Sequence, residues 1–396
     1  MVVGVPCESS PHERRVALVP AVVPTLVKAG LKVLVERGAG ENAGFPDTAY
    51  EEQGASLASD QTQLFSNTDI VVQVHGLTNK PPLGKNPLEL MRSGQILVGL
   101  LNPFGAPEAV KMLATRGVTA FTLELLPRIS RAQPMDALTS MATIAGYKAV
   151  LLAAGALKKM FPMMITAAGT ITPARVFVVG AGVAGLQAIA TARRLGAVVQ
   201  SYDVRPAVKE QVESLGAKFI ELGLETQEAE TAGGYAKAMG EEFYRRQREM
   251  MKQVVAESDV VITTAAIPGK KAPILITQEM VQGMHPGSVI IDLAAEGGGN
   301  CELTKPGESV EANGVTIFGP LNLPSTIPYH ASQMYARNVT AFLLNLIKDR
   351  ELHLNLEDPI IRDTLLTHKG ELVNLQVREL LGLPASALSI SEKSRS

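Results

Sequence analysis

The segment Val176–Gly185, which reads VFVVGAGVAG, constrains the fold of this chain more than any other. An apolar, β-branched run leads into the spacing G-x-G-x-x-G, and a helix over Leu186–Leu195 is predicted to follow. In such a turn Gly180 permits a tight bend, Gly182 lets the backbone approach a pyrophosphate, and Gly185 lets the helix pack against the strand. The segment predicts a βαβ unit that binds a dinucleotide, with a plain glycine-rich packing turn as the alternative.

Asp203 ends the next predicted strand, 18 residues after the last glycine of the motif. At about that distance an acidic residue accepts hydrogen bonds from the ribose hydroxyls of NAD. A carboxylate there would also repel the 2′-phosphate of NADP, so the sequence favours NAD(H). Arg205 keeps the alternative open, because an arginine nearby can accommodate a 2′-phosphate; otherwise its side chain is simply solvated.

Short apolar runs alternate with helical patterns along the chain, which is typical of parallel α/β sheets. The first series of predicted strands is Val2–Pro6, Lys32–Glu36, Ile70–Val74, Ile96–Leu100 and Thr119–Glu124, and its helices are Pro20–Ala29, Asp47–Gln53, Leu88–Ser93 and Ala106–Arg116. The second series has strands Val176–Val179, Val198–Asp203, Lys218–Ile220, Val260–Thr264, Val289–Leu293 and Val315–Phe318, with a helix around Thr277–Met284.

The length of 396 residues suggests about two domains, at roughly 100–200 residues each. The boundaries predict a first α/β domain over 1–137, a Rossmann domain over 138–330, a return to the first domain over about 331–380, and a disordered tail over 381–396. Two long predicted helices, Ala137–Lys159 and Ser332–Ile347, would join the domains. A hairpin is expected over Thr364–Val373.

Composition excludes several function classes. With 37 basic and 39 acidic residues, no tryptophan and 4% aromatic residues, the chain lacks the charge and the stacking platforms of a nucleic-acid binder. Two cysteines and six scattered histidines give no disulfide framework and no metal-ligand spacing, so no metal is expected. No membrane span is expected either. The uncharged stretch 160–174 suggests burial or contact with a partner.

Two polar segments are further candidates for a site. The segment Pro127–Gln133 (PRISRAQ) precedes Asp136, whose simplest role is to cap the long helix that follows. The segment Ala232–Tyr235 (AGGY) lies in a polar stretch, and its paired glycines suit either a movable lid or a plain turn.

Seven blocks of the sequence resemble the NAD(H)-binding component of proton-translocating nicotinamide nucleotide transhydrogenase, whose fold is shared with alanine dehydrogenase. They are Pro127–Ala142, Ile144–Val150, Met163–Arg175, Gly180–Ala197, Gly233–Phe243, Thr263–Pro273 and Gly287–Asn300. The resemblance covers residue 1 to about 375. It implies two Rossmann-like or flavodoxin-like parallel-sheet domains joined by long helices, with NAD in the cleft between them.

The resemblance also implies an activity and partners. The enzyme would be of the Si/Re-specific type, passing hydride directly between NAD(H) on this chain and NADP(H) on a partner subunit. A membrane-spanning subunit would couple this transfer to proton translocation. This chain would be a soluble homodimer in the cytoplasm, peripheral at the inner face of the bacterial inner membrane and not inserted in it.

Site residues follow from the matched motifs. Arg128, Gln133 and Asp136 match a polar cluster at the nicotinamide end, to which we assign the catalytic positioning. Thr139 stands where the family usually has serine, and Ala266 where a leucine is often found. The cofactor-binding residues implied by the resemblance are Arg128, Gln133, Asp136, Thr139, Gly180, Gly182, Val183, Ala184, Asp203, Val204, Arg205, Gly234, Tyr235, Ala265 and Ala266.

Alanine dehydrogenase is the second candidate, and a non-catalytic NAD-binding regulator is the third. Arg15 matches the arginine that binds the substrate carboxylate in alanine dehydrogenase. His75, however, stands in place of the expected lysine, and Val98–Phe104 (VGLLNPF) lacks the expected histidine. Without those groups the proton transfers of oxidative deamination have no evident donor or acceptor.

Overall fold

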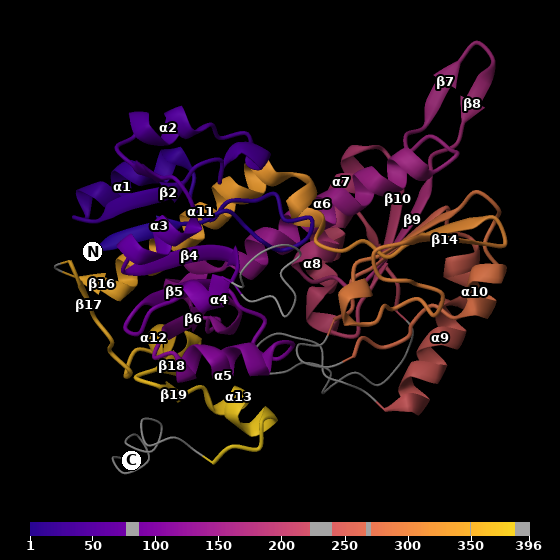
Figure 1. Ribbon diagram of the computed structural model, residues 1–396. Coiled ribbons are helices and arrows are strands. Elements are labelled where there is room, and N and C mark those ends of the chain that lie inside the picture. Colours follow the sequence, from indigo (N-terminus) through magenta and orange to yellow (C-terminus); the bar gives the residue numbers. More distant parts are fainter. Residues whose placement is uncertain (77–86, 222–239, 267–270, 349, 385–396) are drawn as a thin grey trace. The chain divides into compact units, whose positions relative to one another are not determined.

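The computed structural model describes residues 1–76, 87–221, 240–266, 271–348 and 350–384 (Figure 1). The chain divides into two compact units, Met1–Met141 with Ser325–Ser396, and Ala142–Pro324. Each unit is built on its own sheet, so each is described by itself.

The sheet of the first unit has eight strands among the described residues, in the order β19-β18-β6-β5-β4-β1-β2-β3. The six strands from β1 to β6 are parallel, and β18 and β19 form an antiparallel extension at the β6 edge. Their bounds are β1 (Val2–Val5), β2 (Lys32–Glu36), β3 (Ser56–Ala58), β4 (Ile70–His75), β5 (Ile96–Leu100), β6 (Thr119–Thr122), β18 (Leu365–His368) and β19 (Glu371–Leu372).

Helices of the first unit include α1 (Val23–Lys28), α2 (Asp47–Glu52), α3 (Gln61–Asn67), α4 (Pro87–Leu90), α5 (Pro107–Thr115), α11 (Pro328–Leu346), α12 (Pro359–Thr364) and α13 (Leu375–Leu380). The strands β4 and β5 are buried over almost their whole length, as expected for central parallel strands covered on both faces. The helix α11 brings distant sequence into this unit, where the Tyr335 hydroxyl donates to the Gln73 carbonyl at 2.7 Å.

The sheet of the second unit has seven strands among the described residues, in the order β11-β10-β9-β12-β13-β15-β14. All are parallel except β14 at one edge. Their bounds are β9 (Arg175–Val179), β10 (Val198–Tyr202), β11 (Lys218–Phe219), β12 (Val260–Thr263), β13 (Val289–Asp292), β14 (Ser309–Ala312) and β15 (Val315–Phe318). Numbered along the chain, the six parallel strands have the order 3-2-1-4-5-6 of a dinucleotide-binding sheet.

Four helices, α7 (Val183–Arg194), α8 (Lys209–Ser214), α9 (Glu241–Ala256) and α10 (Gln278–Gln282), belong to this unit. The long helix α6 (Ala137–Ala156) contributes Ala149, Val150 and Ala153 to its core. Among the described residues α6 is the one helix long and apolar enough to cross a membrane, a test that buried core helices also pass.

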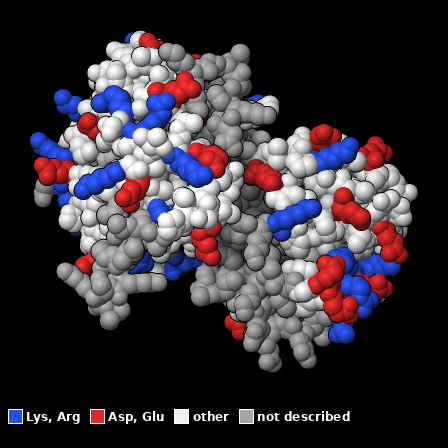
Figure 2. Space-filling model, turned by 60° about the horizontal axis from the view of Figure 1, so that its bottom comes forward, with Lys and Arg blue, Asp and Glu red and all other residues white. Residues whose placement is uncertain are grey.

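The fold class expected from the sequence is confirmed. The predicted strands agree with the structure to within a residue or two. Elements that were not predicted include β3, β14, α3, α8, α9, α12 and α13. On the face drawn in Figure 2, basic and acidic side chains lie interspersed, and among its described residues neither sign forms a continuous patch.

Burial of the uncharged stretch 160–174 proves wrong for most of its length. Its middle forms a hairpin of β7 (Met164–Thr166) and β8 (Gly169–Ile171), whose strand residues are all exposed, while Phe161 and Ala174 near its ends are buried in the core. Figure 1 shows the hairpin projecting from the rest of its unit. Ile165 is 77% exposed, so the lack of charge does not reflect a place in the core.

Candidate functional site

The glycine turn after β9 has the geometry that the sequence predicts. Gly180 has a φ of +99°, a backbone conformation that favours glycine, and an added Cβ would lie 2.4 Å from the Thr264 Oγ1. A Cβ on Gly185 would lie 1.9 Å from the Gly180 carbonyl oxygen, because α7 packs directly against the turn. Both glycines are therefore required for the fold of the turn.

Gly182 is different, because its own backbone geometry does not demand glycine. Its φ is −76°, and an added Cβ would meet no described atom within 4 Å. It caps α7 without a hydrogen bond from any side chain of the described residues, and Val183 and Ala184 begin the helix. Unpaired N–H groups at such a terminus bind anions. This turn thus leaves room and donors for a pyrophosphate, which is the fit a dinucleotide needs.

Asp203 lies beside this turn and is almost fully hydrogen-bonded. Its Oδ2 accepts from the Ala181 N–H at 2.7 Å and from Arg205 Nη2 at 2.9 Å. Its Oδ1 accepts from the Arg205 N–H at 2.8 Å and from Arg205 Nε at 2.9 Å. The Arg205 side chain is only 13% exposed, so its interpretation as a solvated residue is wrong.

The segment after β12 is held to the loop after β13 by the buried amide of Asn300. The Asn300 side chain accepts from the Ala265 N–H at 3.0 Å and donates to the Ala265 carbonyl at 2.8 Å and the Pro273 carbonyl at 2.9 Å. Ala265 is partly buried, Ala266 is exposed, and Val204 packs against the same core cluster as Ala265.

Asp292 organises the loop that carries Asn300. This carboxylate, 0% exposed, accepts from the Asn300 and Cys301 N–H groups and from the Thr263 and Thr304 hydroxyls. Reasoning from the sequence missed both Asp292 and Asn300 as supports of the site. The block Gly287–Asn300 was noticed, but nothing in it reveals which backbone groups its side chains reach.

The expected nicotinamide-end cluster lies in the first unit, on a 3-10 turn over Ser130–Met135 and at the start of α6. Gln133 is exposed, while its neighbours Ala132 and Met135 are buried and anchor the turn. Asn338 of α11 donates to the Pro134 carbonyl at 2.8 Å. The turn thus presents the glutamine side chain outward from a fixed backbone.

The same turn is tied to α12 by a paired contact. Arg131 Nη1 and Nη2 donate to the two carboxylate oxygens of Asp358 at 2.9 and 2.5 Å. The hydrogen bonds from Arg131 lower the pKa of Asp358.

Asp136 caps α6, as its position in the sequence suggests. Its Oδ1 accepts from the Thr139 N–H at 2.9 Å and its Oδ2 from the Thr139 hydroxyl at 2.6 Å. The hydroxyl of Thr139 therefore orients this carboxylate. Arg128 is exposed in the same region of the first unit. Gly234 and Tyr235 lie outside the described residues.

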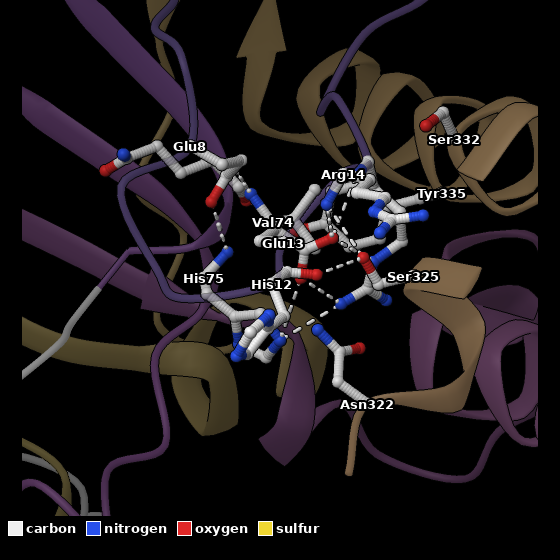
Figure 3. A network of polar contacts seen from close by, with 12 residues as sticks. Glu8, His12, Glu13, Arg14, Val74, His75, Asn322, Ser325, Ser332 and Tyr335 are labelled. Atoms are coloured by element: carbon white, nitrogen blue, oxygen red, sulfur yellow. Dashed lines mark hydrogen bonds and ion pairs between the residues drawn. The ribbon is translucent and has the colours of Figure 1, made fainter. Parts of the chain in front are cut away.

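A second polar network lies at the corresponding place in the first sheet, where β1 and β4 are neighbours (Figure 3). The two side-chain oxygens of Glu8 accept from the N–H groups of Val74 at 2.6 Å and His75 at 3.1 Å. The Arg15 guanidinium donates through Nε and Nη2 to both oxygens of Glu13, at 2.7 and 2.6 Å. Burial and the Glu13 charge raise the pKa of Glu8 to about 8.

Both halves of the chain match family models. Residues 4–145 match the alanine dehydrogenase/PNT N-terminal domain, and residues 149–375 match the alanine dehydrogenase/PNT C-terminal domain. The two matched ranges take in the Glu8 network and the glycine turn, respectively. This chain belongs to the alanine dehydrogenase/PNT family.

The similar proteins include both transhydrogenases and alanine dehydrogenases. The chain is 49% identical over 377 residues to the first piece of the NAD(P) transhydrogenase alpha subunit of Rhodospirillum rubrum, a match covering 94% of this chain and 98% of that protein. It is 30% identical over 391 residues to alanine dehydrogenase of Bacillus subtilis, covering 96% and 95%. A transhydrogenase crystal structure from Sinorhizobium meliloti matches with a TM-score of 0.81 at 41% identity, covering 95% of this chain and all of that one.

Proposed function

We propose that this chain is the NAD(H)-binding component of a proton-translocating transhydrogenase. The observation that carries the proposal is the site of the second unit, where an open position at Gly182 lies at the start of α7 and Asp203 follows the next strand. The 49% identity to a transhydrogenase subunit, against 30% to an alanine dehydrogenase, favours this member of the family.

In this proposal the residues of the chain position the nucleotide. The N-terminus of α7 binds the pyrophosphate, Asp203 accepts from a ribose, and Ala265 and Ala266 form an apolar wall. Arg128, Gln133 and Asp136 hold the nicotinamide end. When bound, NAD(H) supplies the hydride chemistry, so the protein needs no general base and contributes orientation and exclusion of water.

That Gly234 and Tyr235 belong to a lid that closes over the nucleotide stays a prediction. We further propose that NADP(H) is bound by a partner subunit, that a second partner spans the membrane, and that this chain acts at its cytoplasmic face.

The β7–β8 hairpin supports a homodimer. Met163, Met164, Ile165 and Ile171 are 58%, 39%, 77% and 42% exposed, which is an apolar surface suited to a second copy. Ile165→Glu should shift the chain toward monomer in sedimentation velocity. Val198→Glu, at another exposed apolar position, is the matched control and should leave the dimer intact.

The first test of the cofactor is a fluorescence titration. NADH should bind well and NADPH poorly, because Asp203 cannot donate to a 2′-phosphate and repels it. Comparable affinities for the two nucleotides would remove the assignment of Asp203 to the ribose.

Alanine dehydrogenase activity is tested separately. The Arg15 guanidinium donates through Nε and Nη2 to Glu13, and its Nη2 lies 3.0 Å from His75 Nε2. The arginine that would bind a substrate carboxylate thus already has protein partners. Purified protein with alanine and NAD should form no NADH above background. Appreciable turnover that depends on the protein would put alanine dehydrogenase first.

The role of Gln133 is tested by separating binding from transfer. Its amide has donors and an acceptor but no titratable proton, which suits positioning. Gln133→Asn should leave NADH affinity nearly unchanged and strongly slow stopped-flow hydride transfer when the NADP-binding partner is present. Gln282→Asn, an exposed glutamine at the end of α10, is the control. Transfer at the parent rate in Gln133→Asn would refute the positioning role.

A further inference from the structure

The carboxylate of Asp203 has no acceptor position left in this structure. A carboxylate offers about four lone-pair sites, two on each oxygen. Four donors already point at Asp203: the N–H groups of Ala181 and Arg205, and Nε and Nη2 of the Arg205 guanidinium. A ribose hydroxyl can therefore reach this carboxylate only if one of these donors leaves.

The four donors divide into two pairs of different mobility. The Ala181 N–H belongs to the glycine turn and the Arg205 N–H to the chain two residues beyond Asp203, so neither can leave without rebuilding the backbone. The guanidinium, in contrast, lies at the end of a side chain and can move by side-chain rotation without any change of the backbone. Its two donors occupy one position on each oxygen, which matches the two hydroxyls, 2′ and 3′, of a nicotinamide nucleotide's adenosine ribose.

We propose that Arg205 is a specificity-determining residue, whose guanidinium occupies the ribose-hydroxyl positions on Asp203 and is exchanged for them when NADH binds. This inference rests on the proposed function, since it takes Asp203 as the ribose acceptor. The exchange replaces a charge-assisted fork by two hydrogen bonds from neutral hydroxyls, so the arginine weakens NADH binding. While paired, it also masks the carboxylate charge that repels a 2′-phosphate.

Removing the guanidinium should therefore have opposite effects on the two nucleotides. Arg205→Ala removes the side chain that pairs with the Asp203 carboxylate. The affinity for NADH should then rise by about three- to tenfold, which corresponds to the free energy of a partly buried ion pair. NADPH affinity should fall, because an unmasked carboxylate faces its 2′-phosphate. Selectivity for NADH over NADPH thus increases.

The experiment is a titration of both nucleotides by calorimetry on the parent, Arg205→Ala, Asp203→Ala and the double variant. In the Asp203→Ala background, Arg205→Ala should no longer raise NADH affinity, because the competition is gone. Arg194→Ala, which removes an exposed arginine from the last turn of α7, controls for net charge and should change neither affinity. Arg205→Lys keeps the charge without the fork and should give an intermediate NADH affinity, even where the alanine variant fails to fold.

Weaker or unchanged NADH binding in Arg205→Ala and Arg205→Lys would overturn the exchange and show that the arginine assists the bound nucleotide or is irrelevant to it. Failure of the proposed function has a different signature. In that case Asp203→Ala binds NADH as the parent does, or the parent binds neither nucleotide.

Discussion

The two sheets of this protein share one strand order but differ at the point where that order reverses. In the first unit β1 lies between β2 and β4, and in the second β9 lies between β10 and β12. Ligands of open α/β sheets bind in the crevice at this point, beyond the carboxyl ends of the strands. Strand order alone would therefore predict a binding site in each unit.

In the first unit the chain fills that point itself. The turn after β1 carries Glu8 across to the end of β4, where its oxygens accept from the Val74 and His75 N–H groups (Figure 3). In the second unit the turn after β9 carries glycines, and the segment after β12 is held from the other side, by Asn300 beyond β13. The difference teaches that the residues of two turns, and not the strand order, decide whether the reversal point of a sheet is left open for a ligand.

The largest expected effect is at Gly182, the position that keeps the second turn open. Gly182→Ala should fold normally, because its φ of −76° suits alanine and its Cβ meets no described atom. It should nevertheless weaken the affinity for NADH about 100-fold, because the added methyl group fills the pyrophosphate position. Gly155→Ala, an exposed helical glycine with equally free surroundings, is the control and should raise stability by about 0.5–1 kcal/mol. Calorimetry and thermal melts measure both. Parent-like NADH affinity in Gly182→Ala would place the nucleotide elsewhere.

The next effect concerns the clamp of the second unit. Asn300→Ala leaves partly buried backbone groups of Ala265 and Pro273 without these partners and should cost about 2–4 kcal/mol in the free energy of unfolding. Asn300→Asp keeps the shape and the acceptor but loses the donors, so it should fall between parent and alanine. Thermal and urea unfolding, with NADH titration on the folded variants, test this. An alanine variant as stable as the parent would show that the clamp is dispensable.

The filled point of the first unit should reveal itself through pH. With its pKa raised to about 8 from an ordinary 4.5, Glu8 holds a proton in the folded chain that the unfolded chain releases. Stability should therefore fall as pH rises from about 5 to 8, and Glu8→Gln should remove up to about 1.4 kcal/mol per pH unit of that slope. Glu52→Gln, at an exposed glutamate ending α2, is the control. Equal slopes in parent and Glu8→Gln would contradict the assignment of a half-buried, protonated Glu8.

Glu13 should act at the opposite end of the pH range. Burial raises its pKa, but the hydrogen bonds and charge of Arg15 outweigh this and lower the pKa to about 2. Its contribution to stability is present above about 4.5 and is lost as pH falls toward 2. Glu13→Gln should flatten this acid-side loss. It also removes the charge that helps to raise the pKa of Glu8, so stability should fall over a narrower range above pH 5, and urea unfolding across both ranges measures the two effects. If the variant lost stability in acid as the parent does, Glu13 would not be the group responsible for this loss.

The smallest effect is expected at the turn that carries Gln133. Arg131→Lys keeps the charge but loses the paired contact with Asp358, so the turn should be less precisely placed and hydride transfer should slow by about two- to fivefold. NADH affinity should not change. Lys111→Arg, in an exposed pair with Glu108, is the control. A loss of NADH affinity equal to the loss of transfer rate would argue for a general structural defect.

The sequence predicted what depends on local pattern. Strand alternation and the glycine spacing are short-range signals, and the confirmed fold class and the geometry of Gly180 and Gly185 followed from them. The Glu8 contact joins residues 66 apart in the chain and the Asn300 clamp joins residues 35 apart, so no local pattern encodes either. The uncharged stretch 160–174 misled because lack of charge is shared by cores and by exposed apolar hairpins.

The central claim is that the nucleotide binds at the reversal point of the second sheet and not at that of the first. Hydrogen exchange with and without NADH, followed by mass spectrometry, tests it most directly. Peptides covering Gly180–Leu186 and Asp203–Arg205 should gain protection on binding, while those covering Pro6–Ser10 and Val74–His75 stay unchanged. Protection at Glu8 and the end of β4, with none at the glycine turn, would contradict the account.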